Sequence, residues 1–155
     1  MSITMTGGTG IVDPQHAGDF LLGLMEQLKL RRFLEVGQPD EALHARIARE
    51  FPDATVHSVA NDGSFLATHH GAAIYDLVYL DDEARRGELA ADIRSWLPRV
   101  RPGGVLAGSG FNHRHIPVQR ALASVFDLTA VGVGPDSIWF VILTEDLHVG
   151  PAAHG

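Results

Sequence analysis

Short strand-like segments alternate with amphipathic helical segments along most of this chain, and this alternation restricts the folds open to it. The strand-like runs cover residues 33–37, 55–60, 74–80 and 105–108, and helical runs lie before, between and after them. Two more strand-like segments, 128–133 and 138–143, are separated only by residues 134–137. Such a short link predicts an antiparallel hairpin, because a parallel return needs a crossover of roughly a dozen residues. We therefore predict an α/β fold with a mostly parallel sheet, helices on both faces and a C-terminal antiparallel hairpin.

The composition indicates one globular domain and excludes several classes of partner. The chain has 155 residues, no cysteine and a formal charge of −7, from 12 Lys+Arg against 19 Asp+Glu. We predict a single domain over residues 1–155, with a flexible start at 1–12 and a tail at 145–155. An acidic chain is poorly suited to nucleic acid or an anionic membrane surface. Without a signal-like start or an apolar run of about 20 residues, we expect a cytoplasmic protein with no membrane segment.

Five segments between residues 30 and 143 contain motifs of a known kind. Glu35 and Gly37 end the first strand as acid-x-Gly, 56–59 form a second strand, and 75–81 have the sequence YDLVYLD. Residues 96–105 have the sequence WLPRVRPGGV, and residues 137–141 have the sequence SIWFV. These segments resemble class I S-adenosylmethionine-dependent methyltransferases, in particular the small-molecule O-methyltransferase branch with its DLVFID and WLPLLRPGGV motifs. The resemblance implies a Rossmann-like sheet, with a third-strand region that is shortened or absent because only residues 61–73 separate the second strand from the fourth.

The resemblance implies S-adenosylmethionine as the cofactor and assigns residues to hold it. The cofactor would lie across Glu35, Gly37 and either Asn61 or Asp62, with Asp76 near the sulfonium group. Two departures from the family pattern affect this site. Pro39 and Glu41 replace the later glycines of the Gly-rich turn, and Ala60 stands where the family has an acid for the ribose hydroxyls. An alternative interpretation of Asp76 is a hydrogen-bond acceptor at the sheet edge.

The catalytic candidates follow the fourth and fifth strands. Asp81 lies where ligands bind in open α/β sheets, although Asp81 or Asp82 can instead cap the following helix. His113 and His115 follow the fifth strand on the same side, where a general base for an acceptor hydroxyl would lie. These histidines could also share a metal ion with Asp81. The resemblance allows a divalent cation, but we favour a solvated loop over a metal site and assign no metal ligand.

Two hypotheses of different classes follow. The first is a methyltransferase that acts on the hydroxyl, or the amine, of a small-molecule acceptor. The second is a catalytically degenerate methyltransferase-like protein that serves as a binding or assembly module. A shortened sheet would expose the second strand as an edge, so we also expect a homodimer formed through that edge or through the terminal hairpin. Binding of the cofactor discriminates between the two hypotheses.

Overall fold

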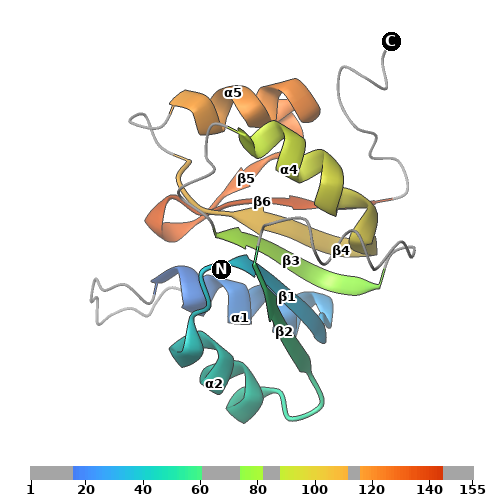
Figure 1. Cartoon of the computed structure of the whole chain (residues 1–155). Helices are drawn as coiled ribbons and strands as arrows, with labels where there is room; N and C mark the ends of the chain where they lie inside the picture. Colours follow the sequence, from blue (N-terminus) through green and yellow to red (C-terminus); the bar gives the residue numbers. More distant parts are fainter. Residues whose placement is uncertain (1–15, 61–73, 82–87, 112–115, 145–155) are drawn as a thin grey trace.

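A computed structural model of the chain describes residues 16–60, 74–81, 88–111 and 116–144, arranged around a six-stranded sheet (Figure 1). Its helices are α1 (His16–Leu28), α2 (Glu41–Glu50), α4 (Leu89–Trp96) and α5 (Ile116–Val125), with short 3-10 turns η3 (Leu97–Arg99), η4 (Leu128–Ala130) and η5 (Pro135–Ser137). Its strands are β1 (Arg32–Gly37), β2 (Thr55–Val59), β3 (Tyr75–Asp81), β4 (Val100–Gly108), β5 (Gly132–Val133) and β6 (Trp139–Ile142). None of the described helices is long and apolar enough to cross a membrane.

The strand order is β2-β1-β3-β4-β6-β5. Strands β1 to β4 run parallel to one another, β6 is antiparallel to β4, and β5 is antiparallel to β6. The predicted mostly parallel sheet with a C-terminal antiparallel hairpin is therefore confirmed. The predicted shortening or loss of the third strand concerns residues 61–73, and the predicted flexible ends concern 1–12 and 145–155. These segments lie outside the described residues.

The sheet separates two hydrophobic cores. Phe33, Leu77 and Val105 pack with residues of α1 and α2 on one face, whereas residues one position further along each strand pack with α4 and α5 on the other (Figure 1). The central strands are covered on both faces, so their sequences are almost continuously apolar rather than alternating. A buried polar residue in these strands is therefore costly unless it is paired.

The terminal hairpin is shorter than predicted. The sequence predicts a strand over 128–133, but residues 128–130 form the turn η4 and only Gly132 and Val133 pair with β6. The Asp127 carboxylate accepts hydrogen bonds from the backbone N–H and the hydroxyl of Thr129, at 3.0 and 2.9 Å. This local side-chain capping stabilises a turn in place of an extended chain, which the β-branched composition alone does not indicate.

Strand β4 begins earlier than predicted. The sequence predicts a tight turn at 101–104 before the strand, but the strand already starts at Val100 and continues through this segment. The pairing with β3 shifts register there, from Tyr75 opposite Val100 to Leu77 opposite Val105. Gly103 has φ 87°, and a Cβ on Gly104 would lie 2.5 Å from the Asp76 carbonyl oxygen. The two glycines therefore permit an irregularity within the strand where a turn was expected.

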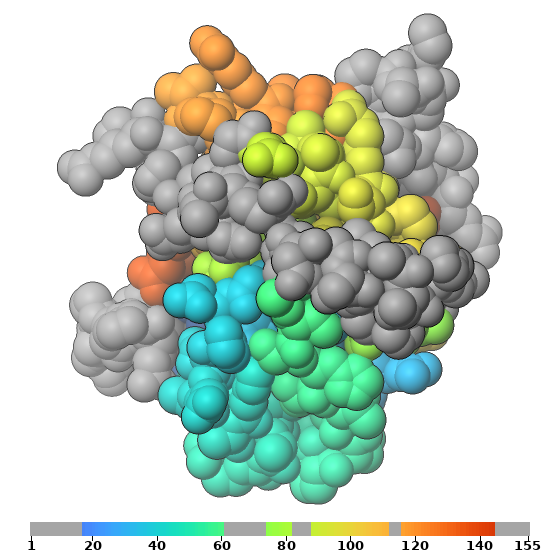
Figure 2. All heavy atoms as spheres, in the orientation of Figure 1, coloured from blue at the N-terminus to red at the C-terminus, as the bar shows by residue number. Residues whose placement is uncertain are grey.

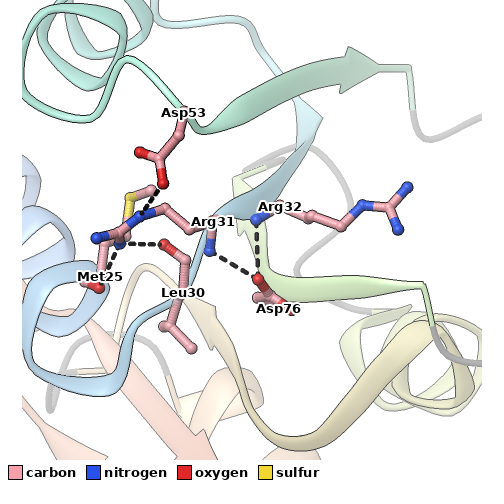
Figure 3. A network of polar contacts seen from close by, with 6 residues as sticks. All are labelled: Met25, Leu30, Arg31, Arg32, Asp53 and Asp76. Carbon is pink, nitrogen blue, oxygen red and sulfur yellow. Dashed lines mark hydrogen bonds and ion pairs between the residues drawn. The ribbon is translucent and has the colours of Figure 1, made fainter.

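The buried carboxylate of Asp76 joins the starts of three strands at the amino edge of the sheet, and Figure 3 shows its contacts with Arg31 and Arg32. One Asp76 oxygen accepts the backbone N–H groups of Arg31 and Arg32 at 2.6 and 3.0 Å, and the other accepts from the Arg101 guanidinium at 2.5 Å. Asp76 is 4% exposed. Burial by itself raises the pKa of this carboxyl, but the two backbone hydrogen bonds and Arg101 hold it below its usual value. The ionised carboxylate thus fixes β1 and β4 against β3.

We expect Asp76→Ala to destabilise the fold by about 3 kcal/mol near neutral pH, because two backbone N–H groups and a guanidinium lose their acceptor. Since the pKa of Asp76 is lowered on folding, its stabilisation is present above about pH 4 and decreases as the pH falls through the folded pKa. The difference between wild type and variant should therefore shrink in acid. Urea unfolding at neutral and acid pH measures it.

Asp53→Ala is the matched control for this substitution. The Asp53 side chain is 72% exposed and pairs with Arg31 at 3.2 Å on the surface. Its loss should cost about 0.5 kcal/mol. Equal stabilities of the two variants at neutral pH would contradict the structural role of Asp76.

Candidate functional site

The carboxyl ends of β1, β3 and β4 meet at one edge of the sheet. Gly37 lies opposite Asp81, and Leu80 lies opposite Gly108. The N–H of Gln38 donates to the Asp81 carbonyl oxygen at 3.2 Å, which holds the chain after β1 beside the end of β3. The structure therefore brings together two of the predicted residues, Gly37 and Asp81, at the edge where open α/β sheets bind ligands.

Glu35 lies beneath this edge and is 0% exposed. Its Oε1 contacts His44 Nε2 at 2.6 Å, and it accepts the backbone N–H of Asp40 at 3.1 Å. The Ser58 hydroxyl donates to the same oxygen at 3.5 Å. The other carboxyl oxygen, Oε2, is buried without a partner, and it is the one buried side-chain acceptor in this condition within the described residues. Such an atom is costly unless a ligand or water satisfies it.

The start of α2 is positioned by acidic side chains. Asp40 is the N-cap, and its side chain accepts the backbone N–H of Leu43 at 3.1 Å. Burial raises the pKa of the Glu35 carboxyl above its usual value, the nearby Asp40 carboxylate raises it further, and the hydrogen bonds from the Asp40 N–H and His44 partly oppose this shift. Proton uptake by Glu35 is thus easier in the folded protein than in the unfolded chain.

A tyrosine hydroxyl completes the polar groups under the edge. Tyr79 is buried, and burial raises the pKa of its hydroxyl, as do the charges of Asp81, Glu35 and Asp40. Its side chain forms a hydrogen bond with Ser109, and the Ser109 hydroxyl donates to Asp81 Oδ1 at 3.4 Å. Sequence reasoning missed Tyr79 and His44. The sequence did offer one signal for Tyr79, because the family motif DLVFID has Phe at the position where this chain has Tyr.

The structure places Asp76 away from these residues. It lies at the start of β3, five residues before Asp81, and therefore about 16 Å away at about 3.3 Å per residue. The expectation that Asp76 lies near the cofactor does not agree with this placement. Its alternative interpretation, a hydrogen-bond acceptor at the sheet edge, describes the contacts with Arg31, Arg32 and Arg101. The motif identified the strand correctly, but it did not distinguish between the two ends.

Several predicted residues lie outside the described part of the chain, namely Asn61, Asp62, Asp82, His113 and His115. Ala60 is described and exposed at the end of β2, where it provides no carboxylate. Among the residues that the structure describes, no group of three or more histidine or acidic side chains is arranged to hold a metal ion.

Comparison with solved structures identifies the fold. The O-methyltransferase TomG from Streptomyces achromogenes, solved with S-adenosylmethionine and involved in tomaymycin synthesis, is 18% identical, with TM-score 0.55 over 87% of this chain and 82% of that one. An O-methyltransferase from Bacillus cereus solved with S-adenosylhomocysteine is 16% identical, with TM-score 0.52 over 87% and 84%. A Thermotoga maritima O-methyltransferase is 13% identical, with TM-score 0.53 over 88% and 68%. No protein-family model and no curated protein matches the sequence. The chain has the class I S-adenosylmethionine-dependent methyltransferase fold.

The described residues fit the positively charged groups of the side-chain end of S-adenosylmethionine, its sulfonium and its ammonium group; the same side chain also contains a carboxylate. The unpartnered Glu35 Oε2 is an acceptor for an ammonium N–H. Gly37 has φ 116°, a conformation that glycine adopts without strain, and it turns the backbone at the end of β1. Asp81 adds a second carboxylate beside Gly37. Figure 2 shows that the cyan segment around residue 40 reaches the molecular surface, so the end of β1 and the start of α2 lie close to solvent.

We expect Glu35→Gln to change how stability depends on pH. Because the pKa of Glu35 is raised on folding, its favourable contribution is present below the usual value of 4.5 and is lost as the pH rises through the folded pKa. Glutamine cannot ionise, so the melting temperature of the variant relative to wild type should increase from about pH 4 to about pH 7. Thermal unfolding followed by circular dichroism over this range measures the difference.

Glu26→Gln, at an exposed position of α1, is the control for this substitution. Its melting temperature should follow the wild-type curve at all pH values. A Glu35→Gln curve parallel to wild type would show that Glu35 does not titrate abnormally.

Proposed function

We propose that the chain is an S-adenosylmethionine-dependent methyltransferase that acts on a hydroxyl, or less favourably an amine, of a small molecule. The main supporting observation is the juxtaposition of Gly37, Asp81 and the unpartnered Glu35 oxygen at the carboxyl edge of the sheet. The fold is shared with O-methyltransferases solved with S-adenosylmethionine or S-adenosylhomocysteine. Asn61 or Asp62 is proposed to complete the cofactor site on the ribose side.

When bound, S-adenosylmethionine supplies a methyl group activated by its sulfonium. Displacement at that group needs an acceptor held in line and relieved of its proton. Asp81 is proposed to hold the acceptor hydroxyl or amine, and Ser109 supports Asp81 through the 3.4 Å contact. His113 or His115 is proposed to remove the proton, and Tyr79 to position Ser109. Metal assistance is not part of the proposal, although a divalent cation remains an experimental variable.

The second candidate function is a methyltransferase-like protein that binds a partner without catalysis. It is supported by Pro39, Glu41 and Ala60, which replace residues used for the cofactor in the resembling family. A homodimer is proposed with either function, because Leu128, Val133 and Ile142 near the terminal hairpin expose apolar side chains. A monomer at high concentration in analytical ultracentrifugation would contradict it. We also propose a cytoplasmic location, where such a cofactor is supplied.

We expect calorimetric titration with S-adenosylmethionine or S-adenosylhomocysteine to show micromolar binding, about −8 kcal/mol, with and without Mg²⁺. Gly37→Ala should weaken binding at least tenfold, because an L-residue resists the observed φ of 116°. Gly103→Ala is the matched control, since Gly103 also has a positive φ of 87° but lies at the start of β4. It should lose similar stability and keep its affinity.

Absence of heat and of a thermal shift with both compounds would reject the methyltransferase and favour the second candidate. Equal affinities of the two glycine variants would move the binding site away from the end of β1. Once an acceptor is found, unchanged turnover after replacing both His113 and His115 by Ala would remove their role as base.

A further inference from the structure

The backbone N–H groups that follow β1 are largely occupied by groups of the protein itself. Gln38 donates to the Asp81 carbonyl oxygen, Asp40 donates to Glu35, and Leu43 donates to the Asp40 side chain. Pro39 has no N–H to donate. A helix N-terminus binds anions when its N–H groups point freely at the ligand. Here two of those donors already hold carboxylates of the chain, so this loop is poorly equipped to bind the carboxylate of a ligand.

The charged side chains at this edge also disfavour a ligand carboxylate. The charges of Asp81, Glu35 and Asp40 all raise the pKa of the Tyr79 hydroxyl, so the three carboxyl groups act on the same part of the protein. Glu41 follows as the first residue of α2. Arg31, Arg32, Arg99 and Arg101 instead adjoin the amino ends of β1 and β4. In the described residues that adjoin the carboxyl ends, 37–41, 59–60, 81 and 108–111, there is no lysine or arginine.

An independent observation indicates a ligand group rather than a solvated acidic surface. Glu35 is 0% exposed, and its Oε2 has no hydrogen-bond partner. Its Oε1, by contrast, is held by the Asp40 N–H and His44. A buried carboxylate with one satisfied and one open oxygen matches a donor that carries a positive charge, because hydrogen bonds between charged groups are the stronger ones.

We propose that the site takes an adenosyl sulfonium whose side chain ends in an ammonium group without a carboxylate, of which decarboxylated S-adenosylmethionine is the simplest example. The proposal rests on the proposed function for the position of the ligand's side chain at the end of β1. Glu35 Oε2 accepts the ammonium group, and Asp40, Glu41 and Asp81 favour the two positive charges. A carboxylate on the same side chain would be repelled by these acids, and the N–H groups of Gln38, Asp40 and Leu43 are already occupied by the protein.

The test is a calorimetric comparison of S-adenosylmethionine with its decarboxylated form on the full-length wild-type chain. We expect the decarboxylated form to bind at least tenfold tighter, a difference of about 1.4 kcal/mol. Glu41→Gln changes an exposed residue and should narrow this ratio by raising the affinity for S-adenosylmethionine. Glu35→Gln should weaken both compounds, because both carry the ammonium group, and should narrow the ratio because the carboxylate of S-adenosylmethionine then meets one negative charge fewer. Glu26→Gln, remote on α1, should leave the ratio unchanged.

The outcomes separate this inference from the proposed function. Equal or tighter binding of S-adenosylmethionine by wild type overturns the inference and leaves a cofactor site in place. A ratio that is the same in wild type, Glu35→Gln and Glu41→Gln also overturns it, because the acids would then not select the ligand. Failure of both compounds to bind rejects the proposed function together with the inference.

Discussion

The buried carboxylate of Asp76 fixes the relative positions of the strands on which the candidate site depends. It holds the start of β1 through two backbone N–H groups and the start of β4 through Arg101. With the amino ends aligned in this way, the parallel registers place Gly37 opposite Asp81 and Leu80 opposite Gly108 at the other end. A structural contact at one edge of the sheet therefore determines which side chains meet at the opposite edge.

The two edges of the sheet differ in charge. Arginines adjoin the amino ends of β1 and β4, while Glu35, Asp40, Glu41 and Asp81 lie at or near the carboxyl ends within the described residues. At the amino edge, the charge of the buried Asp76 is balanced by direct pairing with Arg101. The acidic side contains a buried carboxyl whose pKa is raised and whose second oxygen is unpartnered. The unpartnered Glu35 oxygen therefore lowers the stability of the free protein, and a cationic ligand that binds this oxygen would remove the cost.

Much of the fold was predictable because its signals are local and repeated. Apolar runs bounded by Gly and Pro identified the central strands, and the short link at 134–137 was sufficient to predict the antiparallel hairpin. The errors arose where side-chain capping or a glycine irregularity overrode the pattern, as at Thr129 and at Gly103 with Gly104. For the site, the proximity of Gly37 and Asp81 follows from the strand topology, because both residues end neighbouring parallel strands. The distance of Asp76, the burial of Glu35 and the contribution of Tyr79 depend on register and packing, which a motif does not specify.

The most direct test of the site's location is a two-dimensional amide NMR titration of the full chain with S-adenosylmethionine. If the ligand binds at the carboxyl edge, the amide signals of Gly37, Gln38, Asp81 and Ser109 should shift with saturation. The signals of Arg31, Arg32 and Arg101, at the amino edge, should stay in place. Shifts confined to the amino edge, or none at saturating ligand, would contradict a ligand site at the ends of β1 and β3.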